Sequence, residues 1–157
     1  MPQQLTAPYP DLIQQATGLL SGQSHRVANA ANLSALIFNA LPDINWAGFY
    51  FLEGEELIVG PFQGQPACVR IDMGKGVCGT AAATRATQRV ADVHAFEGHI
   101  ACDPASRSEV VVPLLVDGHL IGVLDIDSPK PDRFSEDDQA GLEALARVYT
   151  NSLASTR

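Results

Sequence analysis

Three cysteines, Cys68, Cys78 and Cys102, are the residues of this chain best suited to chemistry. They stand in the segments PACV, VCGT and ACDP, so each has proline or glycine close by. Proline and glycine favour turns, and glycine lets the backbone approach a ligand closely. We therefore expect the three thiols to be displayed from loops around one pocket, an arrangement that suits redox or nucleophilic thiol chemistry.

The spacing of the cysteines restricts their roles. Nine residues separate Cys68 from Cys78 and twenty-three separate Cys78 from Cys102, whereas structural zinc sites use short paired spacings. An odd number of cysteines leaves at least one unpaired, so in a reducing compartment any disulfide would form transiently. Two alternatives stay open from the residues alone: a catalytic zinc with His94 or His99 as a ligand, and three inert buried thiols.

Carboxylates at strand spacing form a second group. Asp125 and Asp127 are two residues apart, so their side chains share one face of a strand, and Glu109 begins a neighbouring candidate strand. Carboxylates that point into a pocket would bind an ammonium group or become proton donors. The alternative is that all three lie at solvated strand ends.

Two aromatic residues are also spaced so that they share one face of a strand. Trp46 is followed by Tyr50 on the same face of a predicted strand. Such aromatics pack in a core, or they form the wall of a pocket for a methyl or cationic group.

The pattern of apolar residues predicts the elements that must position these side chains. We expect helices over 11–20, 25–41, 77–85 and from 135 onward, and strands over 46–52, 57–62, 68–71, 88–93, 109–116 and 119–127. Asp117-Gly118 should form a tight turn between the last two strands, and a long polar loop should carry Cys102. This order predicts an α+β fold in a single domain over 1–157, with a central antiparallel sheet of about six strands and the N- and C-terminal helices packed on one face.

Length and charge limit the possible functions. A chain of 157 residues can bury enough apolar surface to fold as one domain without disulfides or metals. Its net charge of −8, with ten Lys and Arg residues, argues against a nucleic-acid partner. The longest apolar runs are too short to cross a bilayer and the first residues lack a signal-peptide pattern, so we expect a cytoplasmic protein with no membrane contact.

Five segments give the chain a family resemblance. They are NWAGFY at 45–50, GPFQG at 60–64, GKGVCG at 74–79, HIACD at 99–103 and GVLDIDS at 122–128. With these segments the chain resembles, over nearly its whole length, the free methionine-(R)-sulfoxide reductases, small enzymes built as a single GAF domain. The three cysteines and the aromatic strand separate such enzymes from GAF relatives that only sense a ligand.

The resemblance implies a role for each thiol. Cys102 would attack the sulfoxide sulfur, which releases methionine and leaves a sulfenic acid. Cys68 would be the main resolving cysteine, and Cys78 an auxiliary thiol that can also pair. The disulfide of Cys102 with Cys68 would then be reduced by thioredoxin, itself supplied by NADPH, so no bound cofactor and no metal is expected.

The resemblance also implies how the substrate, free L-methionine-(R)-sulfoxide, is held. Glu109 and Asp127 would serve the sulfoxide oxygen and its proton supply, and Asp125 would bind the ammonium group. Trp46 and Tyr50 would form the wall around the sulfoxide and its methyl. The backbone amides of 100–103 are candidates for the carboxylate, and a homodimer is the state that the family usually forms.

Two rival functions follow from the same features. One is a non-catalytic GAF module that binds a small ligand or a nucleotide. The other is a metal-dependent hydrolase with Cys and His ligands. NADPH consumption coupled to the sulfoxide through thioredoxin would separate the reductase from the first rival, and metal analysis would separate it from the second.

Overall fold

The computed structural model describes residues 5–99, 102 and 104–154. Along the described chain the elements follow in the order α1 (Tyr9–Leu20), α2 (Arg26–Ala40), β1 (Trp46–Glu53), β2 (Glu56–Gly64), β3 (Arg70–Asp72), α3 (Gly76–Thr84), β4 (Gln88–Val90), the 3₁₀ turn η1 (Val93–Ala95), β5 (Ser108–Val116), β6 (His119–Ser128) and α4 (Glu136–Ala154). None of the described helices is long and apolar enough to cross a membrane.

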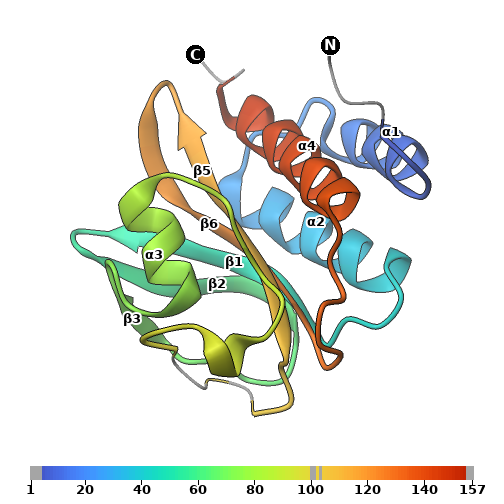
Figure 1. Ribbon diagram of the computed structural model, residues 1–157. Helices are drawn as coiled ribbons and strands as arrows, with labels where there is room; N and C mark the ends of the chain where they lie inside the picture. Colours follow the sequence, from blue (N-terminus) through green and yellow to red (C-terminus); the bar gives the residue numbers. More distant parts are fainter. Residues whose placement is uncertain (1–4, 100–101, 103, 155–157) are drawn as a thin grey trace.

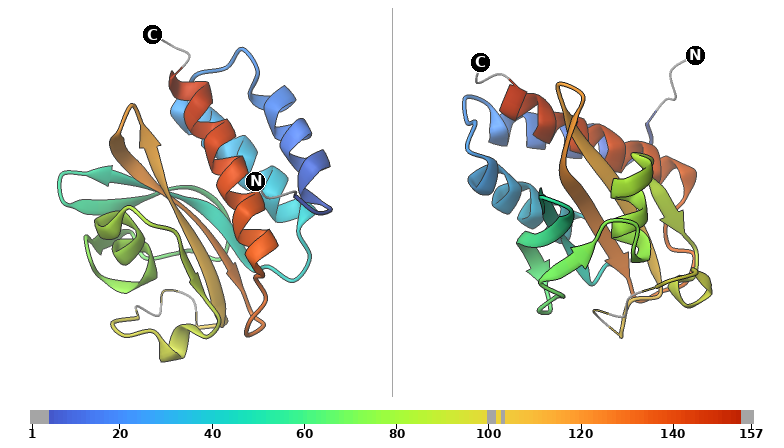
Figure 2. Two further views of the ribbon diagram at one scale, coloured as in Figure 1. Left: turned by 45° about the horizontal axis from the view of Figure 1, so that its top comes forward. Right: turned by 90° about the vertical axis from the view of Figure 1, so that its left-hand side faces the viewer.

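One antiparallel sheet organises the chain. Its strand order is β3-β2-β1-β6-β5-β4, so β1 and β6 lie at the centre. Helices α1, α2 and α4 cover one face, where α2 and α4 contact the strands and α1 packs on α4, while α3 covers the opposite face (Figures 1 and 2). The prediction of an α+β fold with six antiparallel strands and terminal helices on one face is confirmed.

The two faces of the sheet have different cores because side chains alternate along each strand. On β6, Leu124 and Ile126 are fully buried among α1, α2 and α4, while Val123 faces α3. On β1, Phe49 belongs to the helix face and Tyr50 to the α3 face. The larger core, on the helix face, stabilises the sheet, since each fully buried Leu or Phe contributes roughly 1.5–3 kcal/mol. The face covered by α3 has the smaller core and can accommodate a binding site.

Turn and cap residues fix where the elements begin and end. Asp117 and Gly118 both have positive φ, +53° and +80°, which is the backbone of the predicted two-residue hairpin turn between β5 and β6. Ser135 Oγ accepts a hydrogen bond from the N–H of Asp138 at 3.1 Å, and the Asp138 carboxylate accepts one from the N–H of Ser135 at 2.9 Å. This reciprocal cap starts α4 at the predicted place.

Three predicted positions need correction. The strand predicted over 68–71 is the shorter β3, and the strand predicted over 88–93 ends at Val90, because Asp92 caps the turn η1 by accepting from the N–H of His94. Cys78 lies in the first turn of α3 rather than in a loop. Cys102 lies outside helices and strands, as predicted, and Cys68 also lies outside them because β3 begins only at Arg70 and not at Cys68.

Candidate active site

The three predicted carboxylates lie together on the α3 face of the sheet. Glu109 on β5 is the register partner of Asp127 on β6, and Asp125 is two residues before Asp127 on the same face. The exposed fractions of the three residues are 8%, 8% and 4%, respectively. The alternative that these acids are solvated strand ends is therefore wrong, and burial must be compensated by protons or by a ligand.

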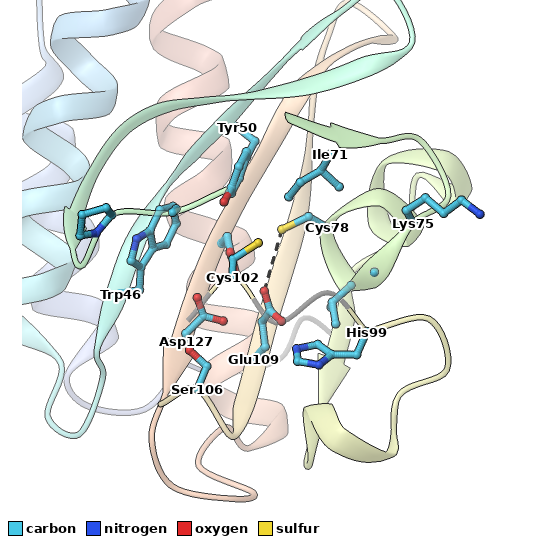
Figure 3. Close-up of a pocket in the computed structure, with 15 residues that line it drawn as sticks. Trp46, Tyr50, Ile71, Lys75, Cys78, His99, Cys102, Ser106, Glu109 and Asp127 are labelled. Atoms are coloured by element: carbon cyan, nitrogen blue, oxygen red, sulfur yellow. Dashed lines mark hydrogen bonds between the residues drawn. The ribbon is translucent and has the colours of Figure 1, made fainter. Parts of the chain in front are cut away.

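One cavity collects nearly all the predicted site residues (Figure 3). Of the predicted residues, those that line it are Trp46, Tyr50, Cys78, Cys102, Glu109, Asp125 and Asp127. Among the proposed site residues that the structure describes, Cys68 lies outside the lining, and a disulfide joins it to Cys102. Sheet, α3 and the loop before β5 therefore meet at a single site.

The disulfide links two parts of the chain that are 34 residues apart. Cys68 precedes β3 and Cys102 lies in the loop before β5, with their Cα atoms 5.3 Å apart. Both cysteines are partly exposed. The pairing implied by the family resemblance is thus present in the structure, and the site is in its oxidised state.

Cys78 is the free thiol of the three and is buried, with an exposed fraction of 5%. Its S–H donates to Oε2 of Glu109 across 3.9 Å (Figure 3). The first turn of a helix lowers a thiol pKa, but burial, followed by the nearby charges of Asp125 and Glu109, raises the pKa of Cys78 well above its ordinary value. Cys78 is therefore a protonated hydrogen-bond donor in this state rather than a ready nucleophile.

Burial also keeps protons on the carboxylates. Burial, and then the charge of Asp125, raises the pKa of Glu109 well above the usual range. Burial, and then the charge of Asp127, does the same to the pKa of Asp125. A carboxyl group with a raised pKa keeps its proton to higher pH and can donate it to a substrate oxygen.

Asp125 has an unfilled hydrogen-bonding position. Its Oδ1 is buried and has no hydrogen-bond partner among the described residues, although Glu109 and the Cys78 thiol lie close enough to the Asp125 carboxyl for hydrogen bonding to lower its pKa in part. On β1 the register partner of Asp125 is Gly48, which has no side chain that could donate a hydrogen bond to it. A buried oxygen without a donor costs about 1–3 kcal/mol, so this atom is a natural position for a donor or a cation from a ligand.

Trp46 and Tyr50, the predicted aromatic wall of the pocket, line the same cavity as these acids. Trp46 stacks on Tyr50 and on Phe62, with ring centroids 5.7 and 5.0 Å apart, and its indole N–H donates to the carbonyl of Gln65 at 3.1 Å. Gly48 permits this packing, because a Cβ there would overlap Phe62 and lie 2.9 Å from the Trp46 ring. Burial raises the pKa of Tyr50, so its phenol stays a neutral donor.

The cavity also contains two residues, Ser106 and Lys75, to which sequence reasoning assigned no role, and the Lys75 amine points away from the carboxylates (Figure 3). His99, which the sequence offered only as a zinc ligand, belongs to the lining too. Ser106 Oγ accepts a hydrogen bond from Asn45 Nδ2 at 3.2 Å, so it has a partner within the protein. A serine and a lysine in polar turns give no distinctive signal, and only their place in the fold brings them to the site.

Comparisons with known proteins agree with this geometry. The sequence profile of the GAF domain family matches residues 22–153. The free methionine-R-sulfoxide reductase of Escherichia coli is 53% identical over 148 residues, which cover 94% of this chain and 90% of that protein. The chain belongs to the free methionine-(R)-sulfoxide reductase family of GAF domain proteins.

Solved structures extend the likeness to three dimensions. The fRMsr of Staphylococcus aureus in complex with its substrate is 51% identical, with a TM-score of 0.90 over 96% of this chain and 99% of that one. A putative GAF sensor protein from Burkholderia vietnamiensis is 62% identical, with a TM-score of 0.88 over 90% of both chains.

Membership of the free methionine-(R)-sulfoxide reductase family confirms the prediction made from the five segments, and with it the prediction that the chain is an oxidoreductase. The backbone amides of 100–103 are predicted to bind the carboxylate group of the substrate. Three of these residues, Ile100, Ala101 and Asp103, lie outside the described residues. That assignment stays a prediction.

Proposed function

We propose that the protein reduces free L-methionine-(R)-sulfoxide to methionine, with Cys102 as the attacking thiol and Cys68 as the resolving thiol. The observation that carries this proposal is the Cys68–Cys102 disulfide beside a cavity that contains Cys102 and three buried carboxylates. A disulfide at that position is the oxidised product that the reaction would leave.

The proposed reaction balances without a bound cofactor. The Cys102 thiol takes the oxygen of the sulfoxide, which gives methionine and a sulfenic acid on Cys102. The Cys68 thiol then condenses with the sulfenic acid, and water leaves as the disulfide forms. Thioredoxin supplies the two electrons and two protons that restore both thiols, and NADPH supplies thioredoxin.

The buried acids would assist the first step. Protonated Glu109, together with Asp127, would hold the sulfoxide oxygen and supply its proton, which the raised pKa of Glu109 supports. Trp46 and Tyr50 would form the wall for the methyl group and the sulfur, as their stacked rings at the cavity suggest. Cys78 would be an auxiliary thiol, and its donation to Glu109 supports a part in holding that acid.

Asp125 would select the free amino acid. A substrate ammonium group would donate to the unpartnered Oδ1 of Asp125, whereas a methionine sulfoxide inside a peptide has no ammonium to offer. Leaving a buried oxygen unpaired costs about 1–3 kcal/mol, which corresponds to roughly 5- to 150-fold in binding. The peptide form should be rejected by about this factor at Asp125 alone.

Regeneration by thioredoxin is supported by the exposure of the disulfide. Cys68 and Cys102 are both partly exposed, so an external dithiolate can attack. Val69, beside Cys68, is 57% exposed and offers an apolar contact there. The homodimer and the cytoplasmic location stay predictions; exposed Leu19 on α1 and Val27 on α2 are apolar surface that a second copy could cover.

The rival function, a module that binds a nucleotide, is disfavoured by the residues that line the site. A phosphate group is bound by cationic side chains and N–H donors, whereas this cavity presents three buried carboxyl groups and the amine of Lys75 points away from them (Figure 3).

The test uses purified reduced protein, free methionine-(R)-sulfoxide, thioredoxin, thioredoxin reductase and NADPH. The proposal predicts NADPH consumption that depends on the sulfoxide and is lost in Cys102→Ser. A variant that consumes NADPH as fast as the wild type would show that Cys102 is not the attacking thiol. N-acetylmethionine sulfoxide is the matched control substrate, because it lacks the ammonium group.

A further inference from the structure

Three buried side chains in the cavity converge on one point. Cys78 on α3, Glu109 on β5 and Asp125 on β6 each have one ligand-type atom within 4.8 Å of the other two. All three residues are more than nine-tenths buried. None of the sequence patterns pointed to this group, because its members come from separate elements.

We propose that Cys78, Glu109 and Asp125 form a binding site for a divalent transition-metal cation, with Zn²⁺ as the best-fitting ion. Zinc binds thiolate sulfur at about 2.3 Å and carboxylate oxygen at about 2.0–2.2 Å in a tetrahedral arrangement, which places sulfur and oxygen about 3.6 Å apart. The Cys78 sulfur lies 3.9 Å from Oε2 of Glu109, so small side-chain movements suffice. The fourth position would face the cavity.

A second observation, independent of the convergence of the three side chains, points to a ligand beside Asp125. Asp125 lines the cavity, and its Oδ1 has no hydrogen-bond partner among the described residues, although the residue is only 4% exposed. A cation at the centre of the group would satisfy this oxygen directly. The other described candidate for a metal, the ring pair of His94 and His99, lies nearer the surface and has centroids 5.9 Å apart.

The cation would replace protons rather than add to existing charge. Burial and mutual repulsion raise the pKa of the Cys78 thiol and of the carboxyls of Glu109 and Asp125. A divalent cation compensates the negative charges that burial otherwise forbids, so binding releases protons and strengthens as the pH rises. The site is therefore selective for a cation that tolerates a sulfur ligand, such as Zn²⁺ or Co²⁺, over Mg²⁺.

The consequence for activity rests on the proposed function, although the cation site itself does not. Zn²⁺ would occupy Glu109 and Asp125, which are the groups proposed for the sulfoxide oxygen and the substrate ammonium. It would therefore compete with the substrate and inhibit the reductase reversibly, and a chelator would restore activity.

The experiment titrates the oxidised protein, in which the disulfide leaves Cys78 as the single thiol, with Co²⁺ as a spectroscopic probe. A sulfur-to-cobalt charge-transfer band should rise to one equivalent, and Zn²⁺ should remove it. Proton release into a weakly buffered indicator solution should accompany binding. No substrate is present, so failure of the reductase proposal would not affect the result.

Three variants locate the site. Cys78→Ser should abolish the band, and Asp125→Asn, which preserves shape, should weaken Co²⁺ binding at least tenfold, with circular dichroism confirming that both are folded. His94→Gln is the matched control and should bind as the wild type does. Absence of a band in the wild type, equal binding by Asp125→Asn, or loss of binding in His94→Gln would overturn the proposal.

Discussion

Replacing Glu109 by glutamine should make the folded protein progressively more stable than the wild type as the pH rises. Burial, and then the charge of Asp125, raises the pKa of Glu109 well above its ordinary value of 4.5. The folded protein therefore keeps a proton on Glu109 at pH values where the unfolded chain has released it. Glutamine has nearly the same shape and does not titrate, so the variant isolates the effect of this proton.

The sign and the size follow from proton linkage. An acid whose pKa is raised by folding contributes stability that is fully present below the unfolded pKa and is lost as the pH rises toward the folded pKa. The difference in unfolding free energy between the variant and the wild type grows by roughly 1 kcal/mol per pH unit over the range in which the unfolded chain has released the proton and the folded protein still holds it. In a domain of this size each such kcal/mol should shift Tm by roughly 2–4 °C.

The assay is urea unfolding of the oxidised wild type and Glu109→Gln at a series of pH values in this window. The difference in unfolding free energy should grow with pH in favour of the variant. Glu56→Gln is the control, because Glu56 is an exposed carboxylate paired with Arg70 at 3.1 Å, and its difference from the wild type should stay nearly constant. A Glu109→Gln difference that is constant or falls with pH would refute the inference that Glu109 is buried as the neutral acid.

Three further predictions concern the reaction. Cys68→Ser should release methionine in its first turnover but fail to turn over with thioredoxin, and a first turnover without methionine would reverse the roles of Cys68 and Cys102. Asp125→Asn should lower kcat/KM for free methionine-(R)-sulfoxide roughly 5- to 150-fold and leave kcat/KM for N-acetylmethionine sulfoxide nearly unchanged. If the ratio of the two kcat/KM values is the same in the variant and the wild type, Asp125 does not select the substrate. Val69→Asp should slow reduction by thioredoxin and leave reduction by dithiothreitol unchanged, with Leu115→Asp, which is 38% exposed on β5, as the control; equal slowing with both reductants would count against docking at Val69.

The sequence carried enough information to predict the fold, because its signals are local. Helical spacing in α2, the Asp117-Gly118 turn and the Ser135 cap each specify an element with few alternatives. The short elements were less predictable: β3 and β4 each have three residues, and their ends depend on pairing with neighbours rather than on propensity.

The site was predictable in its residue types but not in its geometry. The spacing of Asp125 and Asp127 predicted a shared face, yet only the register of β5 against β6 places Glu109 beside them. Burial of Cys78 in α3, rather than display from a loop, depends on how α3 packs on the sheet. The unpartnered oxygen of Asp125 is a property of the assembled cavity, and no local pattern encodes it.

The central claim is that Cys102 performs the chemistry and that Cys68 closes the disulfide. The most direct measurement mixes fully reduced protein with excess free methionine-(R)-sulfoxide and no external reductant, then quantifies methionine and maps disulfides by peptide mass. We expect about one methionine for each Cys68–Cys102 disulfide formed, and no methionine from Cys102→Ser. Methionine released without that disulfide in the wild type, or in equal amount by Cys102→Ser, would contradict the central claim.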